Sequence, residues 1–148
     1  MNRKRFFPIF LTAVCLIAGT AGCGLFPDSH GKPEDEAGAV SVFRQEEIRQ
    51  TGSFRCFLPP DAPDAVRILL LRTGNRMKLT PSFRTSDPRT FPAMLRAGYA
   101  DAAYGTIPEN EAERLQLKCI ALPVGGVLLI RPDDPVWEAQ LREAIPQE

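Results

Sequence analysis

Histidine is nearly absent from this chain of 148 residues, and its four cysteines lie far apart in the sequence. Zinc sites need several histidine or cysteine ligands at short spacing, and redox pairs need a Cys-x-x-Cys motif. Neither pattern occurs, and the one histidine, His30, lies in a polar segment where we expect it to be solvated. The sequence therefore predicts no metal and no cofactor.

An excess of charge of one sign is also lacking. The 18 basic and 18 acidic residues give a formal net charge of zero, whereas proteins that bind phosphate backbones usually show a basic excess or a basic face. Nucleic acid is therefore not an expected partner. Neither a Gly-x-Ser-x-Gly motif nor a phosphate-binding glycine loop occurs, so we do not expect an enzyme. Length and composition fit one globular domain.

The longest hydrophobic run, residues 6–21, is too short to cross a bilayer. A transmembrane helix needs roughly 20 apolar residues. The run follows the basic start Arg3-Lys4-Arg5, and this arrangement is typical of a secretory signal. We therefore predict that residues 1–22 are a signal peptide that is cleaved.

The run closes with Thr-Ala-Gly-Cys at residues 20–23, which resembles the lipobox of bacterial lipoproteins. That resemblance implies that Cys23 is diacylated and becomes the new amino terminus, so that lipid chains anchor the protein in a bacterial membrane. The alternative is ordinary signal peptidase cleavage, which leaves a free Cys23. Residues 23–40 are rich in glycine, proline and acidic side chains, and they predict a flexible tether.

Helical and strand patterns alternate through residues 41–148, the predicted folded domain. The fold class that we expect is α/β: a single three-layer lobe with a mostly parallel open sheet flanked by helices. Asp61 and Thr90 are placed to cap helices, and Trp137, Leu141 and Ile145 share one helix face that should pack on the sheet. The expected helices are 41–50, 62–73, 90–98, 107–117 and 135–145, and the expected strands are 53–58, 78–84, 100–104, 119–124 and 126–130.

The first helix should place Val42, Phe43 and Ile48 on its buried side and Arg44 on its solvated side.

Cys56 and Cys119 both fall in predicted strands, and the secretory signal places them in an oxidising compartment. A disulfide between them would close a long loop and contribute about 4 kcal/mol to stability on the chain-entropy model. We predict this bridge, and two separate buried thiols are the alternative.

Three segments resemble bacterial extracellular solute-binding proteins of the amino-acid-binding family, and they occur in the order found in that family. They are residues 46–63, with a Gly-Ser-Phe-Arg strand start and a Pro-Asp-Ala-Pro turn; residues 95–105, with Ala-Gly-Tyr-Ala-Asp-Ala-Ala-Tyr-Gly; and residues 126–131, Gly-Val-Leu-Leu-Ile-Arg. The resemblance implies a periplasmic-binding-protein-like lobe that binds a small solute. Residues 51–148 supply about one of the two lobes found in that family.

Ligands of open α/β sheets lie beyond the carboxyl ends of the strands. Asp61, Ser86, Tyr104 and Thr106 fall at or near such ends, where hydroxyl, amide and carboxylate groups suit a small polar solute. The family grips its ligand's carboxylate with an arginine in a Thr-x-Glu-Arg motif. An alignment without a gap places Asn110 at that arginine position, and Arg114 matches it if four residues are inserted. The other interpretation of these residues is structural: caps, core and solvated charge.

Together these features predict a lipid-anchored solute-binding protein of the bacterial cell envelope, on the periplasmic or extracellular face. It would bind a small polar, amino-acid-like ligand and serve an ABC transporter or a sensor. The alternative function is a non-catalytic lipoprotein that acts as a protein-interaction or structural module with an envelope protein partner.

Overall fold

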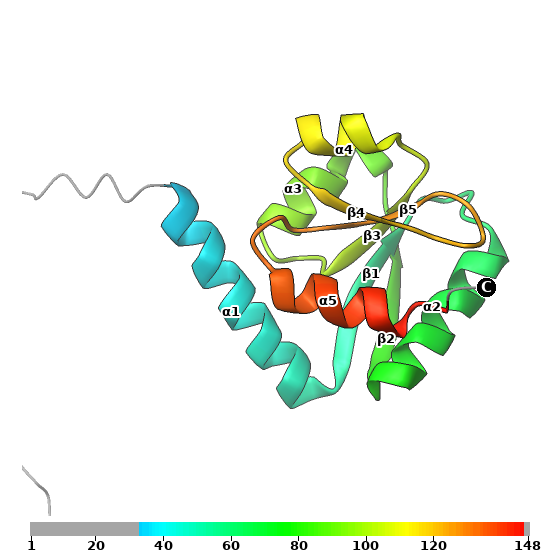
Figure 1. Ribbon diagram of the computed structural model, residues 1–148, viewed down its shortest axis with the longest axis horizontal. Helices are drawn as coiled ribbons and strands as arrows, with labels where there is room; N and C mark the ends of the chain where they lie inside the picture. The colour runs from blue at the N-terminus through cyan, green and yellow to red at the C-terminus, as the bar shows by residue number, and fades with distance from the viewer. Residues whose placement is uncertain (1–32, 147–148) are drawn as a thin grey trace, which may run out of the picture. The chain divides into compact units, whose positions relative to one another are not determined.

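The computed structural model in Figure 1 describes residues 33–146. The predicted signal peptide, Cys23 and His30 lie outside the described residues. Strands and helices alternate along this part of the chain, as the sequence predicted. Their bounds are α1 Pro33–Thr51, β1 Ser53–Leu58, α2 Asp64–Met77, β2 Thr80–Thr85, the 3-10 turn Pro88–Thr90, α3 Phe91–Arg96, β3 Ala102–Gly105, α4 Glu109–Arg114, β4 Lys118–Ala121, β5 Val127–Ile130 and α5 Pro135–Ala144.

One sheet of five strands forms the middle layer, in the order β2-β1-β3-β5-β4. Strand β1 pairs in parallel with β2 and β3, while β5 runs antiparallel to both β3 and β4. Four strands therefore share one direction and β5 opposes them. The reversal follows from the short turn of residues 122–126, because a parallel connection needs a crossover of a dozen or more residues. The predicted single α/β lobe is confirmed, with a mixed sheet.

Helices cover both faces of the sheet and make the predicted three layers (Figure 1). Helices α1, α2 and α5 bury one core cluster, in which Phe54 and Trp137 meet edge to face with 5.4 Å between ring centroids. Helices α3 and α4 bury a second cluster around Phe57 and Phe91. The predicted core face of the last helix is confirmed, since the three residues assigned to that face are buried: Trp137, Leu141 and Ile145.

Helix α1 differs from its prediction in length and in orientation. It begins at Pro33 and not at Ser41, so its first turns fall within residues 33–40 of the predicted tether. A proline followed by acidic residues is a helix-start signal, which these residues carry. The buried side is also different, because Val42 and Phe43 are exposed while Arg44 is only 3% exposed. Arg44 is buried because it pairs with Asp101 at 2.7 Å.

The two predicted helix caps are wrong, whereas another residue does cap a helix. Asp61 does not cap α2, which begins at Asp64 with Pro63 at the cap position. Thr90 makes no side-chain cap for α3, because its hydroxyl donates to the Asp87 carbonyl at 2.7 Å. Asp134 does cap α5, since its carboxylate accepts the backbone N–H of Trp137 at 3.1 Å.

The predicted disulfide is not formed, because Cys56 and Cys119 are both free thiols. Cys56 lies on β1 and Cys119 on β4, with β3 and β5 between them. Three steps across a sheet separate the two strands by about 14 Å, whereas a disulfide needs Cα atoms within about 7 Å. The two thiols also belong to different core clusters on opposite faces of the sheet.

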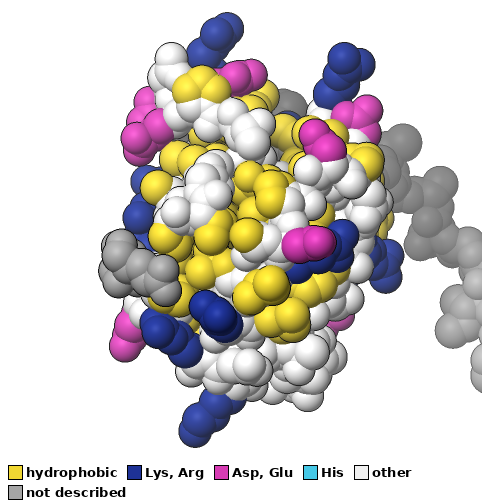
Figure 2. Space-filling model, turned by 90° about the vertical axis from the view of Figure 1, so that its right-hand side faces the viewer, with side chains coloured by type: hydrophobic (Ala, Val, Ile, Leu, Met, Phe, Trp, Pro, Cys, Tyr) yellow, Lys and Arg dark blue, Asp and Glu magenta, His cyan; other side chains and the backbone are white. Residues whose placement is uncertain are grey.

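The α2 side of the lobe carries apolar side chains on its surface. Figure 2 shows this face, where hydrophobic side chains gather between charged ones. Ile68 and Leu71 of α2 and Val124 of the β4–β5 turn are among the exposed large hydrophobic residues. Within residues 33–146, no helix is both long enough and apolar enough to cross a bilayer.

Candidate functional site

A pocket of about 690 Å³ opens at the carboxyl ends of β1 and β3. Parallel strands end at the same edge of a sheet, and the loops that leave them surround a space that the sheet itself does not fill. The pocket is lined by Pro59, Asp61, Pro63, Pro88, Arg89, Phe91, Pro92, Tyr104, Gly105, Thr106, Ile107, Glu111, Leu115 and Leu129.

The lining combines an apolar interior with charged side chains toward solvent. Phe91 and Leu129 are buried members of the α3–α4 core cluster. Three lining residues are exposed and charged: Asp61 before α2, Arg89 in the 3-10 turn and Glu111 on α4. Both signs of charge thus stand around an apolar interior, an arrangement that suits a small molecule with an aliphatic part and polar ends.

The loop that carries Arg89 is held by its own hydrogen bonds. The Asp87 carboxylate accepts the backbone N–H of Arg89 at 2.9 Å, and the hydroxyls of Ser86 and Thr90 lie 3.1 Å apart. Pro88, whose φ angle is restricted by its ring, begins the 3-10 turn. These contacts order the loop without a ligand, and preorganisation reduces the entropy that binding costs.

Of the six residues predicted to bind a ligand, the structure brings three to the pocket lining: Asp61, Tyr104 and Thr106. Ser86 is not in the lining, and its hydroxyl lies beside Thr90. Asn110 and Arg114 lie exposed on α4 and are also outside the lining.

Tyr104 contributes to the pocket although it is largely a core residue. Its side chain is 4% exposed and belongs to the cluster on the opposite face of the sheet. The ring lies against Gly126, where an added Cβ would approach ring atom Cε2 to 2.5 Å. Gly126 also has a φ of +75°, which favours glycine. The structure therefore supports the core interpretation of Tyr104.

Sequence reasoning missed Arg89 and Glu111. Both are charged residues in short helical turns with no motif around them, so a solvated charge was the simplest interpretation. A signal did exist for Arg89. Pro88 and Pro92 flank it in a segment that follows the predicted strand 78–84. Loops after strands are where ligand-binding residues concentrate.

A buried charge network occupies the opposite, amino edge of the sheet. Asp101, fully buried before β3, accepts hydrogen bonds from Arg44 Nε at 2.9 Å and Nη2 at 2.7 Å and from the backbone N–H of Arg55 at 2.7 Å. Arg131, after β5, donates to the Asp134 carboxylate at 3.2 Å. Burial, together with the neighbouring Arg44, lowers the pKa of Arg55. This network joins α1 to the sheet and lies away from the pocket.

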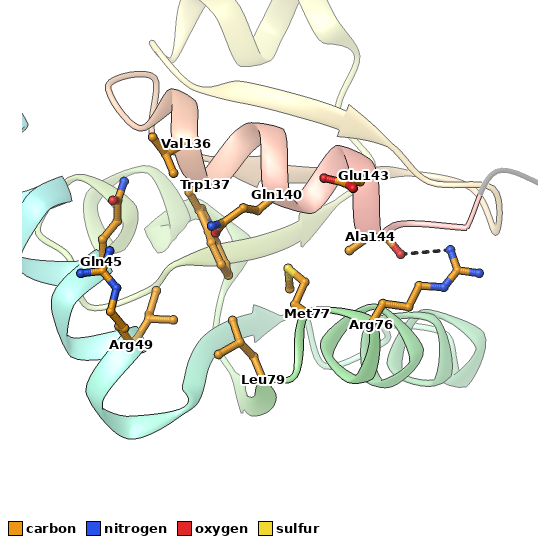
Figure 3. Close-up of a pocket in the computed structure, with 11 residues that line it drawn as sticks. Gln45, Arg49, Arg76, Met77, Leu79, Val136, Trp137, Gln140, Glu143 and Ala144 are labelled. Atoms are coloured by element: carbon orange, nitrogen blue, oxygen red, sulfur yellow. Dashed lines mark hydrogen bonds between the residues drawn. The ribbon is translucent and has the colours of Figure 1, made fainter.

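A second cavity, of about 420 Å³, lies between α1, α2 and α5 (Figure 3). Its arginines already have partners: Arg76 donates to the Ala144 carbonyl at 3.4 Å, and the exposed Arg49 pairs with Glu46 at 2.8 Å. Trp137 forms part of its wall and belongs to the core. The larger pocket at the carboxyl edge is therefore the stronger candidate site. Across residues 33–146, no cluster of three histidine, cysteine or acidic side chains could hold a metal ion.

No family model matches the chain, and no curated protein matches it. Solved structures do resemble it. The arginine-bound form of domain 1 from TmArgBP has a TM-score of 0.55 and 14% sequence identity, and the match covers 67% of this chain and 95% of that one. A mutant of the same arginine-bound domain has a TM-score of 0.54 and 14% identity, covering 68% of this chain and 94% of that one. The likeness shows that this chain shares the fold of that domain, a single α/β lobe.

Proposed function

We propose that this protein is a single-lobed solute-binding protein that holds a small polar ligand in the pocket at the carboxyl edge of its sheet. The observation that carries the proposal is the lining of that pocket, in which Asp61, Arg89 and Glu111 surround an apolar interior. The neighbouring structures support it, because they are binding domains with arginine bound. No catalytic step is part of this proposal.

The charges around the pocket favour a zwitterionic ligand. A cationic group can pair with the carboxylates of Asp61 and Glu111, and an anionic group can pair with the guanidinium of Arg89. The aliphatic part of the ligand would contact Phe91 and Leu129. An amino acid or a related amine has this combination of groups.

We further propose that lipid chains on Cys23 anchor the lobe to the outer face of a bacterial membrane, where it serves transport or sensing. The support is the lipobox-like segment at residues 20–23 that follows the hydrophobic run. Two or three acyl chains give durable anchoring, whereas one gives marginal binding. A transporter or a sensor in the same membrane would then be the partner.

Thermal unfolding against a ligand panel tests the binding proposal. The protein should contain residues 24–148, because α1 begins at Pro33 and a later start would remove part of it. The panel holds amino acids, amines, sugars and small carboxylates. A ligand at about 100 times its dissociation constant adds roughly 2.7 kcal/mol, which raises the midpoint by several degrees for a domain of this size.

Matched variants locate the site. Glu111→Gln, which alters the lining, should lose most of the shift, whereas Glu113→Gln on the same helix lies outside the lining and should keep it. Arg89→Gln and Arg96→Gln form a second pair of the same kind. Equal shifts in all four variants would show that the ligand binds elsewhere.

The anchor has its own test. Cys23→Ser should move the protein from the membrane fraction to the soluble fraction, and a variant that stays on membranes would refute lipid anchoring at Cys23.

A folded protein that responds to no member of the ligand panel would favour the other function, an interaction module of the envelope, and a partner pull-down would follow.

A further inference from the structure

The three most exposed large hydrophobic side chains in the described part of the chain belong to α1 and to the turn before β3. Val42 and Phe43 of α1 are 71% and 67% exposed, and Tyr99, in the turn between α3 and β3, is 62% exposed. Phe43 and Tyr99 line one shallow groove of about 440 Å³. Single exposed apolar residues are ordinary, whereas a contiguous apolar patch marks a surface that contacts something.

The packing of α1 on the lobe fixes this patch in place. Gly98, with a φ of +73°, lets α1 approach closely, since an added Cβ would lie 2.9 Å from Val40. The buried pair between Arg44 and Asp101 holds the same turn of the helix. Val42 and Phe43 therefore point outward because the opposite side of α1 is committed to the lobe.

The chain places this patch close to the proposed lipid anchor. Pro33, the first residue of α1, follows Cys23 by ten residues, and ten residues span at most about 35 Å. Tyrosine and other aromatic side chains favour the interface between membrane and water. A bilayer is thus the apolar surface that the anchor brings within reach of α1.

We propose that Phe43 and Tyr99, which line the same groove, form a membrane-docking surface that brings α1 to the bilayer holding the anchor. This inference rests on the proposed lipidation of Cys23. It also orients the lobe, because the docking surface lies toward the amino edge of the sheet and the candidate pocket opens at the carboxyl edge. The pocket then faces away from the membrane and stays open to solutes.

The charge of α1 predicts which lipids favour docking. The helix holds five acidic residues and two basic ones, and one of the basic residues, Arg44, is buried in its ion pair. Anionic headgroups should therefore repel α1, and contact should depend on the apolar side chains. Docking should be stronger on phosphatidylcholine than on vesicles with half phosphatidylglycerol.

Tryptophan quenching by brominated lipids tests the proposal in the full lipidated chain. Phe43→Trp is compared with Ile68→Trp, which lies on α2 on the other side of the lobe in Figure 1 and is 51% exposed in the parent chain. Trp137, which is 2% exposed, contributes the same background emission in both variants. In brominated phosphatidylcholine vesicles we expect about twofold loss of emission from Phe43→Trp and none beyond background from Ile68→Trp.

The mass of the purified chain is measured first and separates the two proposals. An unmodified Cys23 would overturn the anchor and the docking surface together. A lipidated chain whose Phe43→Trp emission is not quenched would overturn the docking surface alone. Shielding of Phe43→Trp from aqueous acrylamide without lipid quenching would show that a second copy covers the patch, which also overturns docking to the bilayer.

Discussion

Removal of the Asp101 carboxylate should be among the most damaging single changes in the lobe. Asp101 is fully buried and accepts two hydrogen bonds from Arg44 and one from the backbone N–H of Arg55. Asp101→Ala leaves the Arg44 guanidinium, which is 3% exposed, with only the partly exposed Glu47 as an acidic partner. The helix that depends on this pair would then lose its main polar attachment.

The expected magnitude follows from the burial of both partners. Removing one member of a buried ion pair costs about 3–5 kcal/mol, because the other charge stays buried and uncompensated. For a domain of about 100 residues, each kcal/mol lowers the unfolding midpoint by roughly 4 °C or more. Asp101→Ala should therefore unfold at least about 12 °C below the parent chain.

Urea and thermal unfolding of residues 24–148, followed by circular dichroism, measure this effect. Glu46→Ala is the matched control, because its pair with Arg49 is exposed on the same helix and should cost less than about 1 kcal/mol. The double variant Arg44→Met with Asp101→Leu should recover about 2 kcal/mol of the loss, since the buried Arg44 charge is no longer left without Asp101. A cost below about 1 kcal/mol for Asp101→Ala would refute the reasoning.

Three further outcomes are expected. Gly126→Ala should cost about 2–4 kcal/mol in urea unfolding, because the new Cβ meets the Tyr104 ring at a positive φ, whereas Gly52→Ala, with open space around it, should cost about 1–2 kcal/mol. Thiol labelling of residues 24–148 without reductant should count two thiols, Cys56 and Cys119, in the unfolded state, and a count of zero would contradict the strand order. Burial raises the pKa of the Cys56 thiol, so the unfolded chain releases this proton near pH 9 while the folded chain keeps it. The free energy of unfolding should thus fall as the pH rises above about 9, by more in the parent chain than in Cys56→Ala.

The elements that the sequence predicted best are those defined by local pattern. The bounds of β1 agree with the prediction, because an apolar strand ends at two prolines. The apolar face of α5 was also predicted, since Trp137, Leu141 and Ile145 recur at helical spacing and all are buried. Such features depend on residues a few positions apart, which a single sequence displays.

The candidate site was predicted only in part, because local pattern does not show which charged side chains face a pocket. The rule that ligands lie beyond the carboxyl ends of strands located Asp61, Tyr104 and Thr106 at the pocket. It could not identify Glu111, because a charged residue on a short helix has the same local pattern whether it faces a pocket or solvent. Arg44 was assigned to the solvated side for the same reason, although its partner is 57 positions away in the sequence.

The sequence by itself determined the alternation of strands and helices, the core face of α5 and the edge of the sheet where a ligand could bind. Tertiary structure decided which strands are neighbours, and therefore that Cys56 and Cys119 stay apart, that Arg44 is buried and that Val42 and Phe43 are exposed. The physical reason is that local pattern records the period of an element, whereas burial and pairing depend on the surface that the rest of the chain presents to it.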